Sequence, residues 1–110
     1  MLFVSMEDFF VQTKDIPRLS RAEEIALAQR MAAGDRAARE TLIHSHLPMV
    51  AAYVKRAPQQ IRTLHTVYAC LAMVESCVDR FDFLQDSEPF VHYLGWGLRQ
   101  CITRCIADRP

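Results

Sequence analysis

The sequence predicts an all-α protein, a compact bundle of helices without strands. Its 110 residues include only three glycines and five prolines, which favours long elements over the many turns of a β-sandwich. Apolar residues recur every three, four or seven positions in much of the chain, the spacing of amphipathic helices. The length suits one hydrophobic core, and no linker-like composition separates residues 1–57 from residues 58–110. We therefore expect a single domain over residues 1–110.

Helix-capping patterns place the elements of the first half. Ser5-Met-Glu-Asp8 is a capping pattern that opens a short helix, and Pro17 ends it because the residue before a proline leaves the α region. A second capping box, Ser20-Arg-Ala-Glu23, opens the next helix. Gly34 is the expected stop of that helix, and Asp35 is the expected N-cap of a third helix.

Proline positions and apolar spacing place the elements that follow. Pro48 cannot lie inside a helix, so we expect a break at Ser45–Leu47 and a new helix with Pro48 in its first turn. Pro58 closes that helix. Residues 64–81 carry apolar side chains at helical spacing and predict an amphipathic helix of about five turns. Residues 82–86 are predicted to form a loop.

The final helix, from Ser87-Glu-Pro89 to about Ala107, has two stripes. One stripe is apolar and must face the core: Leu94, Leu98, Cys101, Ile102 and Cys105. The other contains Tyr93, Trp96, Gln100 and Thr103, flanked by Arg99 and Arg104. This arrangement suits the binding of unstacked bases, because rings stack on bases, polar groups reach base edges and arginines hold phosphates. Periodicity alone favours the alternative that both rings pack on a neighbouring helix.

Gly95 and Gly97 are unusual inside this helix, because each costs about 1 kcal/mol relative to alanine. We expect either that another segment approaches the helix closely at these positions or that the helix is weakened there.

The four cysteines are predicted to be small buried residues without chemistry of their own. Cys70, Cys77, Cys101 and Cys105 all lie in helical patterns, and no Cys-x-x-Cys occurs. His44 and His46 are two residues apart, so on a helix they point in different directions. We therefore expect no metal site and no cofactor.

Composition also excludes several function classes. Thirteen basic residues balance 13 acidic ones, so the chain has no net charge that would attract nucleic acid or a membrane. No apolar run is long enough to span a bilayer, and the opening residues lack the basic lead of a signal peptide. No Gly-rich loop, nucleophile motif or ligand-spaced His or Cys pair predicts an enzyme or a small-molecule substrate. We expect a cytoplasmic protein without catalytic activity.

The final helix resembles a segment of the bacterial sigma-70 family. Tyr93-Leu-Gly-Trp96-Gly-Leu-Arg-Gln-Cys-Ile-Thr-Arg-Cys-Ile-Ala-Asp108 is similar to the family's Tyr-Ala-Thr-Trp-Trp-Ile-Arg-Gln-Ala-Ile-Thr-Arg-Ala-Ile-Ala-Asp. Arg80-Phe-Asp82 resembles Lys-Phe-Asp, and stretches from Ile16 to Arg56 resemble the helices that precede it. The resemblance covers nearly the whole chain and implies the second conserved region of sigma factors with the short region before it. It also places the four cysteines where the family has alanine or glycine, which supports packed, inert thiols.

The resemblance implies transcription initiation: docking on core RNA polymerase and capture of flipped non-template bases of the promoter −10 element. It assigns Tyr93 to stacking on the flipped adenine and Trp96 to a wedge against the last paired base. Gln100 and Thr103 match positions that read the upstream edge. The full set of implied DNA contacts is Phe90, His92, Tyr93, Trp96, Arg99, Gln100, Thr103 and Arg104.

The sequence departs from the family at the helix that grips the polymerase clamp helices. Residues 64–79 are the implied surface for polymerase or another protein, with His65, Tyr68, Ala69, Leu71, Ala72 and Glu75 as its contacts. Tyr68 and Leu71 suit a protein contact on this surface, and they suit the core equally. The family has Asp, Gln, Glu and Asn where this chain has His65, Tyr68, Ala69 and Leu71. The loop Leu84–Glu88 is acidic where the family is basic, and Gly97 replaces the second tryptophan.

Two functional classes remain open at this level. One is a divergent initiation module that binds core polymerase and single-stranded −10 DNA. The other is a degenerate sigma-fold regulator that binds a different protein through residues 64–79. The chain ends at Pro110 without the family's later DNA-reading domains, so we expect either a fragment or a protein made of this domain alone.

Overall fold

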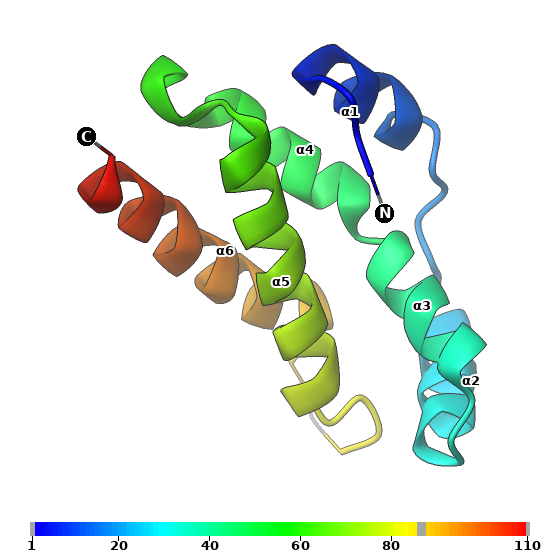
Figure 1. The fold of residues 1–110 in the computed structure, drawn as a ribbon. Helices are drawn as coiled ribbons and strands as arrows, with labels where there is room; N and C mark the ends of the chain where they lie inside the picture. Colours follow the sequence, from blue (N-terminus) through cyan, green and yellow to red (C-terminus); the bar gives the residue numbers. More distant parts are fainter. Residues whose placement is uncertain (1, 86–87, 110) are drawn as a thin grey trace.

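The structure, a computed structural model, describes residues 2–85 and 88–109 and is all-α in these residues, as predicted (Figure 1). Its elements are α1 (Met6–Thr13), α2 (Arg21–Ala32), α3 (Arg36–His44), α4 (Leu47–Arg56), a 3-10 turn η1 (Gln59–Ile61), α5 (Leu64–Arg80) and α6 (Phe90–Asp108). Asp86 and Ser87, part of the predicted acidic loop and helix start, lie outside the described residues.

Local signals fix the ends of α2 and α3. Glu23 N–H donates to Ser20 Oγ at 3.1 Å, and Glu23 Oε1 accepts from Ser20 N–H at 2.8 Å, which is the predicted capping box. Gly34 follows α2 with φ +96°, a left-handed conformation that favours glycine. Asp35 Oδ1 accepts from Ala38 N–H and caps α3. The α1 cap differs slightly from the prediction, because Asp8 Oδ2 accepts from Val4 N–H instead of from the cap residue.

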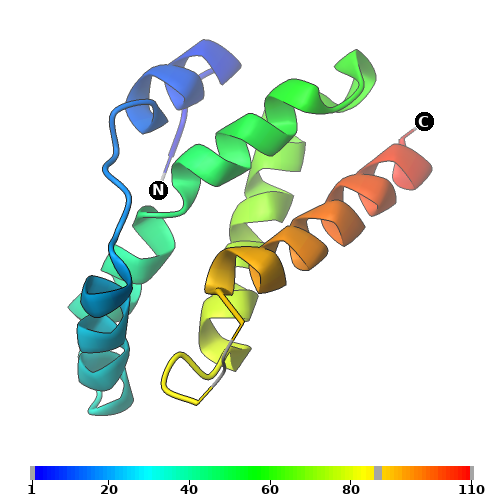
Figure 2. The same ribbon diagram turned by 180° about the vertical axis from the view of Figure 1, so that it is seen from behind.

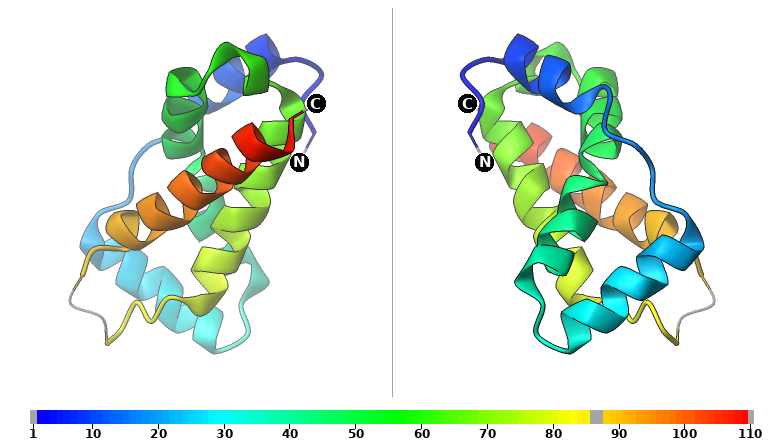
Figure 3. Two further views of the ribbon diagram at one scale, coloured as in Figure 1. Left: turned by 90° about the vertical axis from the view of Figure 1, so that its left-hand side faces the viewer. Right: turned by 90° about the vertical axis from the view of Figure 1, so that its right-hand side faces the viewer.

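The helices pack as a hairpin beside a three-helix core. α2 and α3 lie side by side at one end of the molecule, α1 packs on α4, and α4, α5 and α6 pack on one another (Figure 2). Figure 3 shows the α2–α3 hairpin and the C-terminal end of α5 at the same end of the molecule, away from the C-terminal end of α6. The largest fully buried apolar side chains are Phe9, Leu42, Leu47, Val50, Val54, Val67, Val74, Val78, Phe90, Leu94 and Leu98.

Close approach explains the two glycines of α6. A Cβ at Gly97 would lie 2.9 Å from Met73 Sδ and 3.0 Å from Cys77 Sγ, both on α5. A Cβ at Gly95 would lie 3.1 Å from Tyr53 Oη on α4. Because Met73 fills the space beside Gly97, this packing leaves no room for a tryptophan at that position.

The segment before α1 is attached to α5. Phe3 N–H donates to Tyr68 Oη at 3.0 Å across 65 positions of sequence. The Phe3 ring is buried and meets the Phe9 ring edge-to-face, with centroids 5.0 Å apart. Tyr68 therefore has an intramolecular partner.

Within the described part of the chain, every helix is too short or too polar to cross a bilayer.

Candidate functional site

The exposed side of α6 brings together most of the residues that sequence analysis selected for DNA contact. Trp96 is 63% exposed, which shows that the prediction from periodicity alone, of a ring packed on a neighbouring helix, is wrong for this residue. One shallow depression is lined by Ala107 and by five larger side chains, which are called the α6 face below: Trp96, Arg99, Gln100, Thr103 and Arg104. The Arg99 guanidinium carbon lies 5.9 Å from the Trp96 ring centroid, which is a cation–π arrangement.

Tyr93 lies at one edge of the α6 face and is half-buried. Its ring centroid is 5.3 Å from that of Phe81 and 6.4 Å from that of Phe90. These contacts hold the ring against the body of the protein and leave part of it open. Tyr93 is therefore more constrained than Trp96.

Phe90 is one of the predicted DNA contacts, but the structure buries it. Its side chain is only 1% exposed and packs among His46, Phe81, Phe83 and Tyr93, with centroids 4.8 to 6.4 Å apart. This ring at the first turn of α6 is covered by His46, before α4, and by Phe81 and Phe83, after α5. In this structure Phe90 supports Tyr93 and is not available to DNA.

His92 is exposed on the first turn of α6, with Nδ1 3.7 Å from Glu88 Oε1. The carboxylate is part of the acidic connection before α6. It places negative charge at the N-terminal end of the helix and away from Arg99 and Arg104.

A neighbouring depression contains Arg56, a cation that was not among the predicted DNA contacts. Arg56, at the end of α4, lines it together with Arg99 and Thr103 of α6 and Tyr53 of α4, with a volume of about 460 Å³. Arg56 lies 43 positions from Arg99, so no local spacing connects the two. Within residues 2–85 and 88–109, no carboxylate lies within ion-pair distance of Arg56, Arg99 or Arg104. Three arginines along this side of α6 therefore keep their charge available.

The predicted partner surface on α5 is only partly exposed. His65, Ala72 and Glu75 are exposed, Ala69 is half-buried, and Tyr68 is half-buried and bonded to Phe3. These five residues are called the α5 face below: His65, Tyr68, Ala69, Ala72 and Glu75. Leu71, also among the predicted contacts, does not belong to this surface, because its side chain is only 7% exposed and is part of the hydrophobic core.

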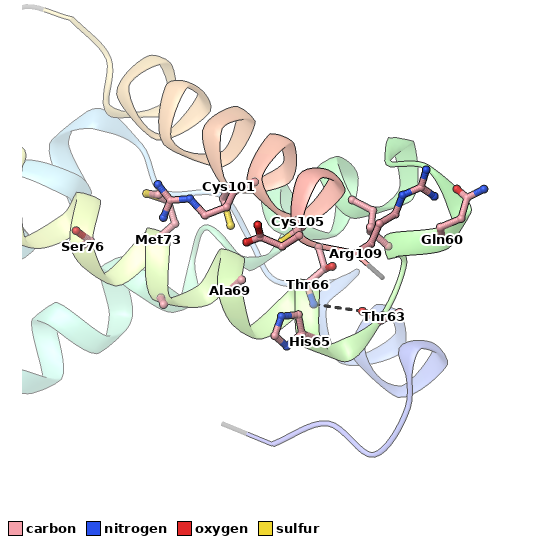
Figure 4. Close-up of a pocket in the computed structure, with 14 residues that line it drawn as sticks. Gln60, Thr63, His65, Thr66, Ala69, Met73, Ser76, Cys101, Cys105 and Arg109 are labelled. Carbon is pink, nitrogen blue, oxygen red and sulfur yellow. Dashed lines mark hydrogen bonds between the residues drawn. The ribbon is translucent and has the colours of Figure 1, made fainter.

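A groove of about 620 Å³ separates the α5 face from the C-terminal half of α6 (Figure 4). His65, Ala69 and Ala72 line its α5 wall, and Cys101 and Cys105 line its α6 wall. Among the described residues, no group of three or more His, Cys, Asp or Glu side chains could hold a metal ion.

Comparison with known proteins identifies the family to which the chain belongs. Residues 5–37 match a family model described as sigma-70 factor, region 1.2. "RNA polymerase sigma factor SigA" of Clostridium acetobutylicum is 38% identical over 95 residues, which cover 86% of this chain and 25% of that protein. The proteins of the same name from Listeria monocytogenes and Listeria innocua are each 36% identical over 92 residues, covering 83% of this chain and 24% of theirs.

These matches and the helical fold define a sigma-factor-like transcription module. The chain belongs to the sigma-70 family, as its resemblance in sequence predicts. It spans about a quarter of the length of the curated relatives it matches.

Proposed function

We propose that the chain is a transcription-initiation module whose α6 face binds single-stranded DNA of the promoter −10 element and whose α5 face docks on core RNA polymerase. The observation that carries the proposal is the exposed Trp96 ring with Arg99 above it and Gln100 and Thr103 beside it. Such a module acts in the cytoplasm, where polymerase and promoter meet. Its chemistry is the stabilisation of an opened duplex and not catalysis.

The α6 face offers the two kinds of contact that single-stranded DNA needs. An exposed aromatic ring stacks on an unpaired base, with a contribution of about 1–3 kcal/mol per base. Arg56, Arg99 and Arg104 supply positive charge for the phosphates beside that ring. Gln100 and Thr103 carry an amide and a hydroxyl that reach base edges.

Docking on polymerase is proposed to be weaker than for family members with the usual helix. The α5 face carries His65, Tyr68 and Ala69 where the resembling sequence has Asp, Gln and Glu. Removing one partner of a buried charged contact costs about 2–5 kcal/mol. In a pull-down with core polymerase at equal concentration, this chain should bind less than the corresponding domain of a housekeeping sigma factor. Equal or tighter binding would show that the altered α5 face forms a sufficient contact of its own.

The second candidate is a sigma-fold regulator that binds a different protein through the α5 face. The hydrogen bond from Phe3 to Tyr68 favours it, because the chain itself occupies a position that faces polymerase in the resembling sequence. This alternative needs no role for Trp96.

Fluorescence of the single tryptophan separates the two candidates. A −10-like single-stranded oligonucleotide at micromolar concentration should quench Trp96 at low salt, where phosphate attraction is least screened. By anisotropy of a labelled oligonucleotide, Trp96→Ala should weaken binding about 5- to 150-fold, the equivalent of 1–3 kcal/mol. Arg99→Ala should also reduce the slope of log affinity against log salt by about 0.7.

Two controls make this experiment specific. Arg80→Ala removes an exposed cation of α5 outside the α6 face and should leave affinity and salt slope unchanged. A scrambled oligonucleotide of equal length tests base preference. An unchanged Trp96 signal in low salt would make the regulator the better account.

A further inference from the structure

Two thiols of α6 border the same groove. Cys101 and Cys105 both line the groove of about 620 Å³ between α5 and α6, and neither forms a disulfide. Figure 4 shows their sulfur atoms on the side of α6 that faces α5. Cys101 is 8% exposed and Cys105 is half-buried, so both thiols lie at the edge of the core next to the solvent in the groove. Cys70 and Cys77 of α5 are buried and are not among the described residues that line it.

A third sulfur atom, that of Met73, lines the same groove from α5. Met73 Sδ lies 2.9 Å from the position that a Cβ would take at Gly97. Gly97, Cys101 and Cys105 follow one another at intervals of four residues, so they lie on one face of α6, about 6 Å apart along its axis. The three sulfur atoms therefore follow this face of α6 in a row, with Cys101 in the middle.

Sulfur ligands select the kind of cation that such a groove binds. Thiolate and thioether sulfur are soft ligands, which favour Cu(I) over magnesium, calcium or manganese ions. Zinc in proteins is held by four ligands, or by three and a water. Within residues 2–85 and 88–109, no group of three or more His, Cys, Asp or Glu side chains could supply such a set. Copper(I) forms linear complexes with only two thiolates, so a pair of cysteines is sufficient for it.

The spacing of Cys101 and Cys105 suits a linear complex. Cβ atoms four positions apart on a helix are about 5–6 Å apart. With metal–thiolate bonds of about 2.3 Å, the length found for zinc, the sulfur atoms of a linear complex would be about 4.6 Å apart. Rotation of the two side chains about their Cα–Cβ bonds reaches that separation without movement of the helix. A disulfide needs Cβ atoms about 3.5–4.5 Å apart, so a direct bond between these two thiols would distort α6.

We propose that Cys101 and Cys105 form a binding site for one Cu(I) ion in the groove between α5 and α6. Each thiol gives up its proton as the ion binds, and two thiolates with one monovalent cation leave a complex with one negative charge. Arg104 and Arg109 also line the groove and supply positive charge beside the complex. Asp108 is the one carboxylate among the described lining residues. The excess of positive charge favours the thiolate form that binds the ion.

The sequence alone predicts inert cysteines, because two cysteines at helical spacing serve equally well as core packing. The packing of α6 on α5 decides that this face of α6 borders a groove and that a thioether lies opposite. The inference does not depend on the proposed function, because it concerns only the affinity of two thiols for a metal ion.

The test titrates the full, reduced chain with Cu(I) under anaerobic conditions, in competition with the chromogenic chelator bicinchoninate. We expect a thiolate-to-copper charge-transfer band in the ultraviolet that stops rising at one equivalent of Cu(I). Cys101→Ala and Cys105→Ala should each abolish this endpoint. Cys77→Ala, a matched change of a buried cysteine outside the groove, should keep it. An excess of zinc ions should not displace the bound Cu(I).

Alkylation by iodoacetamide locates the ion in the wild-type chain, so the result does not depend on the folding of a variant. Trypsin separates Cys101 (residues 100–104) from Cys105 (residues 105–110), because Arg109 precedes a proline and is not cleaved. Bound Cu(I) should slow the alkylation of both thiols, most visibly at the more exposed Cys105.

Four results would overturn the inference. The first is a chain that takes no Cu(I) from the chelator. The second is an endpoint that survives the loss of Cys101 or Cys105, and the third is an endpoint that requires Cys77. The fourth is an unchanged rate of alkylation at Cys105 in the copper-loaded chain.

Discussion

Replacing Gly97 by alanine tests the close approach of α6 to α5. The added Cβ would lie 2.9 Å from Met73 Sδ, 3.1 Å from Met73 Cγ and 3.0 Å from Cys77 Sγ. Favourable separations between non-bonded carbon atoms are about 3.5–4.0 Å, so both side chains must move. Met73 is half-buried and can shift, whereas Cys77 is enclosed in the core.

Two opposing terms set the expected magnitude. Overpacking a core typically costs about 1–3 kcal/mol. Alanine is favoured over glycine inside a helix by about 1 kcal/mol. The difference predicts that Gly97→Ala lowers the free energy of unfolding by about 0–2 kcal/mol. Gly95→Ala is the matched control, because its Cβ meets only the tip of Tyr53 at 3.1 Å and the tip of Met49 at 3.8 Å. That substitution should stabilise the protein by about 0.5–1 kcal/mol.

Urea denaturation followed by circular dichroism measures both effects. Met73→Ala should relieve the part of the clash that Met73 causes, so Gly97→Ala made in that background should destabilise the protein less, while the contact with Cys77 remains. The resulting coupling should be about 1 kcal/mol or more, within the range for residues in contact. If Gly97→Ala and Gly95→Ala stabilise the protein equally, the close approach of α6 to α5 is refuted.

Three further predictions test separate parts of the fold. Phe90→Ala should lower the free energy of unfolding by about 3–5 kcal/mol, while Phe90→Leu should fold and keep oligonucleotide affinity, which anisotropy measures. Burial lowers the pKa of His46, so stability should fall as pH drops below about 6.5, where the unfolded chain takes up the proton first. His46→Gln should remove that slope in denaturation curves, and exposed His44→Gln should not. Asp79→Asn should cost less than about 1 kcal/mol, because the Arg39–Asp79 pair is largely solvated. The hydrogen bond from Arg39 lowers the pKa of Asp79 in the folded protein. The stabilisation that this pair gives to the folded state is therefore fully present above about pH 3.9, the pKa of an unfolded aspartate. It is lost as the pH falls through the lower pKa that Asp79 has in the folded protein.

Helix ends were predictable from sequence because their causes are local. The capping box of Ser20 and Glu23, the left-handed Gly34 and the first-turn position of Pro48 each depend on neighbours within a few residues. The same holds for the apolar stripe of α5, which spacing alone identifies.

Contacts between distant segments were not predictable in this way. The bond from Phe3 to Tyr68 and the fit of Met73 against Gly97 depend on how complete helices pack. The two stripes of α6 were visible in the sequence, but only packing on α4 and α5 decides that Trp96 faces solvent. Packing likewise decides that Leu71, which the sequence leaves open between a protein contact and the core, is buried.

The hydrogen bond between Phe3 and Tyr68 also constrains how this sequence changes over evolutionary time. A position that carries glutamine in the resembling sigma-70 segment here secures the chain before α1. Selection for a folded protein therefore maintains Tyr68 independently of any partner. The fold does not constrain the exposed positions His65, Ala72 and Glu75 in this way, so their residue types should vary unless a bound protein constrains them. Among natural variants, we expect residues 3 and 68 to change together, because their rings also lie 6.2 Å apart. Invariance at the three exposed positions would indicate an interaction that the fold itself does not require.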